Sequence, residues 1–305
     1  MPLKIYPPVM DIYELVGNTP LINLSDYLQN TRIQLFAKAE WFNPGGSIKD
    51  RPAREIILAA EKEGKLNHKK RILDATSGNM GIAYTLLGRA RGYKVTLCLP
   101  ENVSPERKRL LKIFGAEIIL TDPLESIDGA IMLARRLYQS DPEKFFYADQ
   151  YSNPANVLAH YKTTGPEIWE QTSGKITHFI AGLGTSGTLM GVGKFLKEKN
   201  PHIKLIGIQP DAPLHGIEGL KHMLSALRPS IYQEDFLDEI IYVSTEEAYH
   251  MVKRLLQEKS LFVGVSSGAA LAGALKLAQT LSEGVIVTVF PDSGHKYLSE
   301  AFWED

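Results

Sequence analysis

The 305-residue sequence contains a single cysteine, Cys98. An intramolecular disulfide and a cysteine-rich metal site are therefore both excluded. Cys98 lies within the apolar run 95–99, and this position predicts a buried structural thiol. The eight histidines show no metal-ligand spacing, so we predict no metal site.

The sequence also lacks a charge bias and a long apolar run. Its 34 basic and 35 acidic residues give a net charge of −1 without a basic block, which argues against nucleic-acid binding. No apolar run approaches the roughly 20 residues of a membrane-spanning helix. Residues 1–14 carry prolines and charges where a signal peptide has its apolar core. We therefore predict a cytoplasmic protein that has no membrane partner.

Strand-like apolar segments alternate with helical segments along most of the chain. Two short strands are expected at 21–24 and 33–37, ahead of the alternating pattern. Further strands are predicted at 71–75, 94–99, 117–120, 176–181, 204–209 and 285–290. Helices are predicted at 81–91, 104–114, 127–138, 187–197, 245–258 and 268–280. This alternation indicates an α/β fold with parallel sheets that helices cover on both faces.

The polar stretch 149–156 interrupts this alternation near the middle of the chain. The length fits about two domains, so we predict an N-terminal α/β domain at 1–150 and a C-terminal one at 151–305. Segment 1–40 can pack on the second domain. Residues 211–240 also break the pattern, and such a long excursion often lines a functional site.

The stretch 43–52 reads Asn-Pro-Gly-Gly-Ser-Ile-Lys-Asp-Arg-Pro and brings Lys49 to the start of a helix. Pro52 is tolerated only in a first helical turn, so the helix must begin within a few residues of Lys49. The partial positive charge of a helix start favours an uncharged amine, which is the form that a nucleophilic or Schiff-base lysine needs. On spacing alone, an ordinary junction with a solvated lysine is the commoner explanation.

Three loops of small residues each follow a predicted strand and precede a helix. Loop 182–188, Gly-Leu-Gly-Thr-Ser-Gly-Thr, can surround a phosphate with backbone N–H groups and hydroxyls. Loop 76–81 can bind an anion in the same way, with Asn79 within reach of a ring hydroxyl, although a capped turn explains it equally well. In loop 264–270, Ser267 has a simple alternative role as an N-cap.

A dinucleotide site is a rival explanation of loop 182–188, because its glycines match the G-x-G-x-x-G pattern. Gln209 falls near the position where such a site needs a ribose-binding carboxylate, which argues against this rival. Asp211, two residues later, keeps it open. His295, in the stretch 290–297, has no carboxylate partner at helical spacing and is interpreted as a structural or rim residue.

The stretches 43–52, 76–81, 182–188 and 265–268 resemble, in order and spacing, the pyridoxal-phosphate-dependent β-replacement enzymes. Within that group the chain is similar to the cysteine synthases, particularly the B or phosphoserine-using branch. Further matches at 99–102, 114–117 and 149–156 extend the resemblance over nearly the whole chain. The resemblance implies a two-domain, fold type II enzyme, tryptophan synthase β-like, with pyridoxal 5′-phosphate between the domains.

The resemblance also implies a role for individual residues. Lys49 would hold the cofactor as a Schiff base and act as the catalytic base. The other cofactor-binding residues would be Asn79, Gly184, Thr185, Ser186, Gly187, Thr188 and Ser266. The substrate-binding residues would be Thr76, Ser77, Gly78, Met80, Gln150 and Lys221.

Three of these positions bear on chemistry and specificity. Ser266 would face the pyridine nitrogen with a neutral hydroxyl, which weakens the electron sink and suits elimination. Met80 stands where many family members have threonine, so a hydroxyl contact with the substrate is lost. Lys221 aligns with an arginine of the phosphoserine-using enzymes, and a solvated surface lysine is its alternative interpretation.

The implied activity is cysteine synthesis from an activated serine, either O-acetylserine or O-phosphoserine. The implied sulfur donor is sulfide, thiosulfate or a thiocarboxylated carrier protein, and the implied assembly is a homodimer. Two alternatives remain, a cystathionine β-synthase-like enzyme and a non-catalytic binding partner built on the same fold.

Overall fold

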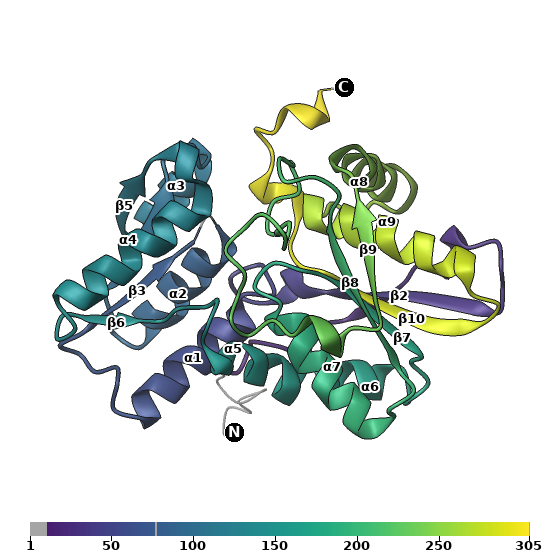
Figure 1. Ribbon diagram of the computed structural model, residues 1–305, viewed down its shortest axis with the longest axis horizontal. Coiled ribbons are helices and arrows are strands. Elements are labelled where there is room, and N and C mark those ends of the chain that lie inside the picture. The colour runs from purple at the N-terminus through teal and green to yellow at the C-terminus, as the bar shows by residue number, and fades with distance from the viewer. Residues whose placement is uncertain (1–10, 77, 305) are drawn as a thin grey trace, which may run out of the picture.

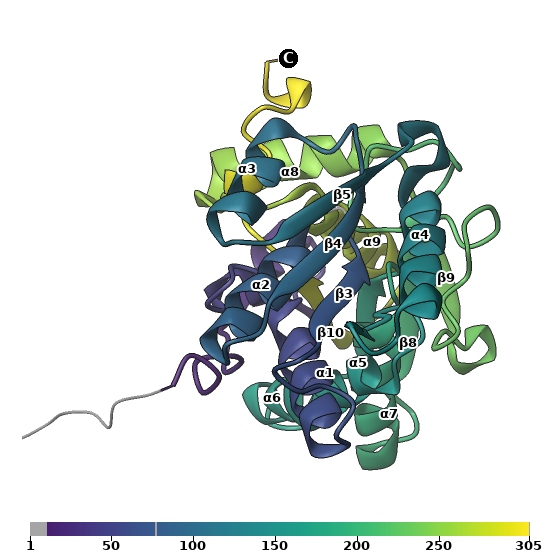
Figure 2. The same ribbon diagram turned by 90° about the vertical axis from the view of Figure 1, so that its left-hand side faces the viewer.

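The computed structural model describes residues 11–76 and 78–304, and these residues form two β-sheets flanked by helices (Figure 1). The smaller sheet has the strand order β5-β4-β3-β6, and the larger has the order β1-β2-β10-β7-β8-β9. Figure 2 shows the smaller sheet in front of the larger one. The α/β architecture predicted from the sequence is confirmed.

The smaller sheet is entirely parallel and contains β3 (Arg71–Ala75), β4 (Val95–Pro100), β5 (Glu117–Thr121) and β6 (Phe145–Tyr147). One face packs on α4 (Ser126–Ser140), and the other packs on α1 (Asp50–Lys62) and α2 (Asn79–Ala90). A further helix, α3 (Pro105–Ile113), joins β4 to β5. We call this sheet with its four helices the small-sheet unit.

The central strand β4 is buried along its whole length, as expected for a parallel strand that is covered on both faces. Cys98 lies in this strand and is fully buried. Burial raises the pKa of its thiol to about 12. The predicted burial of this thiol is therefore confirmed.

The larger sheet contains β1 (Leu21–Asn23), β2 (Ile33–Ala39), β7 (His178–Gly182), β8 (Lys204–Pro210), β9 (Glu239–Val243) and β10 (Gly284–Phe290). All neighbouring strands are parallel except β1, which runs antiparallel to β2. One face packs on α8 (Thr245–Lys259) and α9 (Val265–Thr280). The other packs on α6 (Gly165–Gln171) and α7 (Gly187–Lys199). We call this assembly the large-sheet unit.

The beginning of the chain contributes strands to the sheet of its second half. Strand β2 pairs with β10 from Gly284↔Ile33 to Phe290↔Ala39. The chain then crosses to the small-sheet unit through the loop that precedes α1. The boundary between domains at residue 150 stays a prediction.

Several helices and strands were not predicted from the sequence, because they are short or lack a clear hydrophobic periodicity. They are β6, β9, α5 (Pro154–Ala159), the π-helical turn η4 (His160–Thr164) and α6. Short 3₁₀ turns occupy Ser25–Tyr27, Glu40–Phe42, Pro123–Glu125, Glu234–Phe236, Gly294–Lys296 and Ala301–Trp303.

Two predicted helix starts were wrong. Helix α2 begins at Asn79 rather than at residue 81, and α9 begins at Val265 rather than at residue 268. Gly264 is the N-cap of α9, so Ser267 is not. Gly268 does not begin the helix but permits close packing, because a Cβ there would lie 2.1 Å from the Ala248 carbonyl oxygen of α8.

None of the described helices combines the length and the apolar character that crossing a membrane requires. Among the same residues, no group of three or more histidine, cysteine, aspartate or glutamate side chains is arranged to hold a metal ion.

Candidate active site

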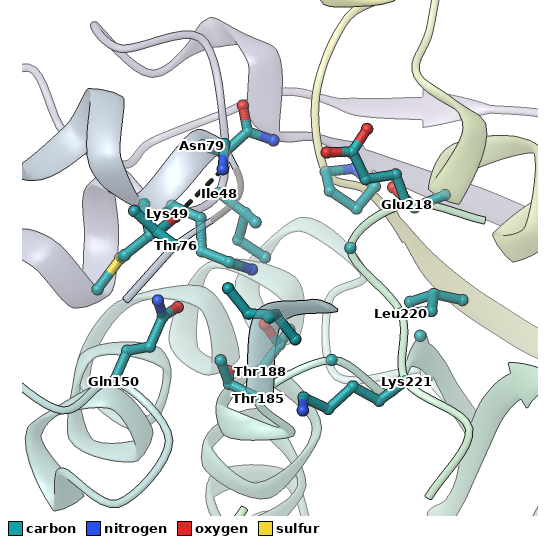
Figure 3. Close-up of a pocket in the computed structure, with 18 of the residues that line it drawn as sticks. Ile48, Lys49, Thr76, Asn79, Gln150, Thr185, Thr188, Glu218, Leu220 and Lys221 are labelled. Atoms are coloured by element: carbon teal, nitrogen blue, oxygen red, sulfur yellow. Dashed lines mark hydrogen bonds between the residues drawn. The ribbon is translucent and has the colours of Figure 1, made fainter. Parts of the chain in front are cut away.

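A cavity opens between the two units, and most of the predicted site residues line it (Figure 3). The small-sheet side and its flanking loops contribute Lys49, Thr76, Gly78, Asn79, Met80 and Gln150. The large-sheet side contributes Gly184, Thr185, Ser186, Thr188, Lys221 and Ser266. Gly187 does not line the cavity and is the first residue of α7, directly after Ser186. Ser77 lies outside the described residues.

Lys49 is the N-cap residue of α1, and its side chain reaches into the cavity. Figure 3 shows its amine end directed toward Thr188 and Thr185, with Gln150 to one side of them. Burial lowers the pKa of the Lys49 amine, while the charge of Asp292 opposes this change. The amine is therefore biased toward its neutral form, which is the nucleophilic and basic one. Lys49 is not a solvated surface lysine.

A buried group of charged side chains fixes the segment that carries Lys49. Two residues after Lys49, Arg51 donates to both oxygens of Glu40, at 2.7 and 2.8 Å, and to both oxygens of Glu167, at 2.6 and 2.8 Å. Lys38 Nζ lies 2.7 Å from Glu167 Oε2. Arg51, Glu40 and Lys38 are fully buried. These bonds attach the start of α1 to strand β2 and helix α6.

The loop before α7 forms a cradle of backbone N–H groups. Ser186 has a left-handed conformation with φ of 68°, directly ahead of the helix start at Gly187. Its hydroxyl is buried and finds no hydrogen-bond partner among the described residues. At Gly184 a Cβ would lie only 2.2 Å from the Gly219 carbonyl oxygen. Backbone N–H groups, a helix start and an unpartnered hydroxyl together form a site for an anion such as phosphate.

His160 lies behind this cradle on the π-helical turn η4. Its Nδ1 is 2.9 Å from Thr164 Oγ1, and its Nε2 is 3.3 Å from Thr188 Oγ1. Burial lowers the pKa of His160 well below its usual value, so the ring is neutral. If Nε2 carries the ring proton, it donates to the Thr188 oxygen and leaves the Thr188 hydroxyl proton free to point at an anion.

The β3–α2 loop faces the cradle from the small-sheet side. Gly78 N donates to Thr76 Oγ1 at 3.2 Å, and Gln150 Nε2 donates to the Ala75 carbonyl at 2.9 Å. Gln150 N donates to Asp74 Oδ2 at 3.3 Å. Burial raises the pKa of Asp74 to about 7. The loop and Gln150 are thus held against each other, with Thr76 and Gly78 bordering the cavity.

Met80 and Ser266 occupy helix starts on opposite sides of the cavity. Met80 is the second residue of α2 and is buried in the apolar core of the small-sheet unit as well as lining the cavity. Ser266 is the second residue of α9 and is 6% exposed. The partial positive charge of the α9 start disfavours a further positive charge on a ligand atom beside Ser266.

The sequence analysis missed Asp292, Lys296 and Tyr297, which follow strand β10. Asp292 Oδ2 accepts hydrogen bonds from Asn79 Nδ2 at 2.7 Å and from the Tyr297 hydroxyl at 3.0 Å. Lys296 Nζ donates to Asn79 Oδ1 at 2.6 Å. In this stretch the sequence analysis singled out His295 instead, which is exposed and does not line the cavity. The available signal was the position after a parallel strand, where the other site loops also lie.

Arg107 and Glu218 were also missed as lining residues. The Arg107 guanidinium pairs with the Glu218 carboxylate and lies 4.9 Å from the centre of the Tyr297 ring. Lys221 lies nearby and pairs with Asp128 at 3.0 Å. The Lys221 side chain is only 7% exposed, so its interpretation as a solvated surface lysine is wrong.

Gln209 has a structural role. It is 2% exposed, and its Oε1 accepts a hydrogen bond from Met223 N at 2.9 Å. Asp211 is exposed. Neither residue lines the cavity that holds the 184–188 loop, so neither supplies a ribose-binding carboxylate for a dinucleotide there.

Comparison with known proteins identifies the group to which this site belongs. Residues 12–292 match the family described as pyridoxal-phosphate dependent enzyme. The chain is 53% identical to a cysteine synthase of Aquifex aeolicus, over 96% of this chain and 92% of the relative. It is 40% identical to cysteine synthase B of Pseudomonas aeruginosa, over 98% of both chains.

A crystal structure of cysteine synthase (OASS) from Entamoeba histolytica is similar throughout. It superposes with a TM-score of 0.91 at 36% identity, over 100% of this chain and 93% of the other. The chain belongs to the pyridoxal-phosphate-dependent cysteine synthase family. Membership of this family favours an enzyme over a dinucleotide-binding protein and over a non-catalytic binding partner.

The residues of the cavity fit pyridoxal phosphate. The cradle at the start of α7 has the unpartnered Ser186 hydroxyl for a phosphate oxygen, and Gly184 keeps the backbone accessible. On the other side of the cavity, Lys49 has the lowered pKa that bond formation with an aldehyde requires. A loop suited to phosphate and an amine of lowered pKa thus face one cavity from two different units.

Proposed function

We propose that this enzyme makes L-cysteine by β-replacement, in which sulfur takes the place of an oxygen leaving group at Cβ of an activated serine. One observation carries the proposal. The neutral-biased amine of Lys49 and the phosphate cradle at 184–188 face the same cavity. An amine alone is compatible with many reactions, whereas an amine opposite a phosphate site is what pyridoxal phosphate requires.

We assign the cofactor contacts as follows. Lys49 would hold the cofactor covalently, Gly184 to Thr188 would bind its phosphate, and Ser266 would lie toward its ring nitrogen. Asn79 is positioned for the ring oxygen, and its amide is held in one orientation because Lys296 bonds its oxygen and Asp292 bonds its nitrogen. When bound, pyridoxal phosphate withdraws electrons from Cα of the amino acid and makes the Cα proton acidic.

On the substrate side, the loop 76–80 and Gln150 grip the carboxylate, with Thr76, Ser77, Gly78 and Met80 as the loop residues. The Lys49 amine removes the Cα proton as general base. The Cβ–O bond then breaks, and the leaving group departs as an anion. A Cβ–S bond forms with the sulfur donor, and Lys49 returns the proton to Cα.

The activated serine is O-acetylserine or O-phosphoserine. The sulfur donor is sulfide, thiosulfate or a thiocarboxylated carrier protein, since each delivers a sulfur nucleophile to Cβ. Sulfide gives cysteine directly, whereas thiosulfate gives S-sulfocysteine and the carrier gives a thioester, which a separate reduction or hydrolysis must convert to cysteine. Turnover measured with the three donors at equal concentration ranks them. We also propose a homodimer, which the family resemblance implies, and a location in the cytoplasm. Light scattering on the purified protein tests the assembly.

The test of the reaction is the variant Lys49→Ala. We expect turnover of activated serine to fall by at least about 10²–10⁴-fold, the typical contribution of a positioned acid or base. Pyridoxal phosphate should still bind non-covalently through the 184–188 loop. The measurement combines cysteine formation with the visible absorbance of the protein before and after reduction with borohydride, which fixes a Schiff base.

The matched control is Lys65→Ala, which removes an exposed lysine that pairs with Glu63 at the surface. This control should keep both turnover and the reducible cofactor bond. Substantial cysteine formation by Lys49→Ala would show that the lysine is assigned wrongly.

A further inference from the structure

Two ion pairs of opposite polarity join the two units, and three of their four residues, Arg107, Glu218 and Lys221, line the cavity. In the first, Arg107 of α3 pairs with Glu218 in the stretch after β8. In the second, Asp128 of α4 pairs with Lys221 of the same stretch, at 3.0 Å. The cation comes from the small-sheet unit in one pair and from the large-sheet unit in the other. Figure 3 shows Glu218 and Lys221 on the same side of the cavity.

The pair formed by Lys221 and Asp128 has further bonds on both partners. Lys221 Nζ also donates to the Leu227 carbonyl at 3.3 Å and lies 5.0 Å from the centre of the Tyr151 ring. The second oxygen of Asp128 accepts a hydrogen bond from Leu227 N at 3.0 Å. Lys221 is 7% exposed and Asp128 is 28% exposed at their side chains. The ammonium is therefore surrounded by partners rather than open to a ligand.

The first pair is also partly removed from water. The Arg107 side chain is 7% exposed, and that of Glu218 is 31% exposed. Arg107 also donates to the Lys296 carbonyl at 3.4 Å. Burial raises the pKa of the Glu218 carboxyl, and the Arg107 guanidinium opposes this rise by favouring the charged form.

The remaining basic side chains of the cavity lining are Lys49 and Lys296. Lys49 is biased toward the neutral amine by burial. Lys296 donates to the carbonyls of Gly45, at 3.3 Å, and Gly46, at 3.0 Å, and to Asn79. Among the described residues that line the cavity, every cationic side chain already has an acceptor. None is left for a second dianion beside the cofactor phosphate.

We propose that Asp128 and Glu218 determine which activated serine this enzyme uses. By pairing with Lys221 and Arg107 they reject the dianionic leaving group of O-phosphoserine and admit the uncharged ester of O-acetylserine. The inference rests on the β-replacement proposed above and names the substrate class for that site.

The physical reason is a competition for two cations. To pair with Lys221, a phosphate must displace the Asp128 carboxylate and leave it partly buried without its cation, which is costly. A phosphate that does not displace the carboxylates is repelled by both of them. An acetyl ester carries no charge and meets neither cost. Rejection by unfavourable charge is a common route to specificity.

The decisive variants are Asp128→Asn and Glu218→Gln, which keep the side-chain shape but remove the negative charge. The measurement is kcat/KM of the holoenzyme for O-phosphoserine and for O-acetylserine, with sulfide as the common donor. We expect the wild-type enzyme to prefer O-acetylserine. In each variant the O-phosphoserine to O-acetylserine ratio should rise about ten- to hundredfold, as a charged hydrogen bond to phosphate becomes available.

Two further variants test whether the freed cation is responsible. In Asp128→Asn combined with Lys221→Met, the gain should disappear, because the phosphate no longer has the ammonium to pair with. Glu234→Gln removes the same charge from an exposed pair with Arg228 on the same excursion of the chain, outside the cavity lining. This control should leave the ratio unchanged.

A binding measurement gives a readout without turnover. Inorganic phosphate, added to the holoenzyme and followed by ³¹P NMR line broadening, should bind Asp128→Asn about tenfold or more tightly than wild type. A wild-type preference for O-phosphoserine, or the same ratio in both carboxylate variants, would overturn the inference. If wild type uses neither substrate, the proposed reaction fails instead, while phosphate binding still decides the role of the two carboxylates.

Discussion

Lys49 shows how a single residue acquires its chemistry from its surroundings. The loop sequence places it at a helix start, and that position favours a neutral amine. In the folded protein, burial is the largest cause of its lowered pKa, while the charges of Asp292 and Glu40 oppose it. The helix start supplies the position, and the enclosing units supply most of the change in basicity.

Gly184 permits a close backbone approach that no other residue allows. A Cβ at Gly184 would lie 2.2 Å from the Gly219 carbonyl oxygen, which belongs to the backbone and cannot rotate away. The 184–188 loop must therefore shift in Gly184→Ala. Overpacking of this kind costs about 1–3 kcal/mol. We expect the dissociation constant of pyridoxal phosphate to rise by roughly five- to hundredfold, as measured by absorbance titration of the apoenzyme.

The control for this prediction is Gly64→Ala. Gly64 ends the turn after α1 with φ of 68° and has no atom within 4 Å of an added Cβ. This substitution strains the backbone and lowers stability without touching the cradle. Equal cofactor affinity in Gly184→Ala and wild type would show that the loop does not bind the phosphate.

At the scale of secondary-structure elements, the buried charged side chains around Arg51 hold helix α1 against strand β2 and helix α6. Helix α1, strand β2 and helix α6 each contribute a charged side chain to this group. Burying charges is costly, and the cost is recovered only with nearly complete pairing. Arg51 meets this condition because its guanidinium donates to both oxygens of two carboxylates. The group therefore fixes the direction in which α1 starts, and with it the position of Lys49.

Glu167 gives this group a signature in the pH dependence of stability. Burial alone would raise its pKa, but Arg51 and Lys38 lower it to about 2 from an ordinary value of 4.5. A carboxyl with a lowered folded-state pKa stabilises the protein above its unfolded pKa, and this stabilisation is lost as the pH falls. Wild type should therefore lose about 3 kcal/mol from this group between pH 4.5 and pH 2.

The variant Glu167→Gln should lack most of this loss, while being less stable than wild type at pH 7. Urea unfolding of the apoenzyme at a series of pH values measures both effects. Glu63→Gln, at an exposed pair with Lys65, serves as the control and should follow the wild-type curve. A variant curve parallel to wild type between pH 4.5 and pH 2 would contradict this account.

At the scale of the whole molecule, the proposed cofactor contacts join two units that have separate apolar cores. The small-sheet unit encloses one set of buried side chains, and the large-sheet unit encloses others on the two faces of its sheet. The proposed cofactor contacts come from both units, with Lys49 and Asn79 on one side and the 184–188 loop and Ser266 on the other. Binding should therefore couple their unfolding.

We expect two calorimetric transitions for the apoenzyme and a single, higher one for the holoenzyme. At a free cofactor concentration of about 100 times its dissociation constant, the gain in stability should be about 2.7 kcal/mol. Differential scanning calorimetry with and without pyridoxal phosphate makes this measurement. Two transitions that both stay at their apoenzyme temperatures after saturation would mean that the cofactor contacts do not span the units.

The sequence by itself determined the local features of this protein. Alternating strands and helices, the helix start at Lys49 and the small-residue loop 182–188 depend on neighbouring residues, so periodicity, glycine and proline reveal them. The same reasoning misplaced the start of α9, because Gly268 is required by contact with another helix and not by its own turn.

Only the tertiary structure decided which distant residues meet. Asn79 and Asp292 are 213 positions apart, Arg107 and Glu218 are 111 apart, and Lys221 and Asp128 are 93 apart. No local pattern connects such residues, because their contact depends on how two sheets are placed against each other. The residues that we propose for the reaction were therefore predictable from loop sequences, whereas the ion pairs that we propose select the substrate exist only once the two units face one cavity.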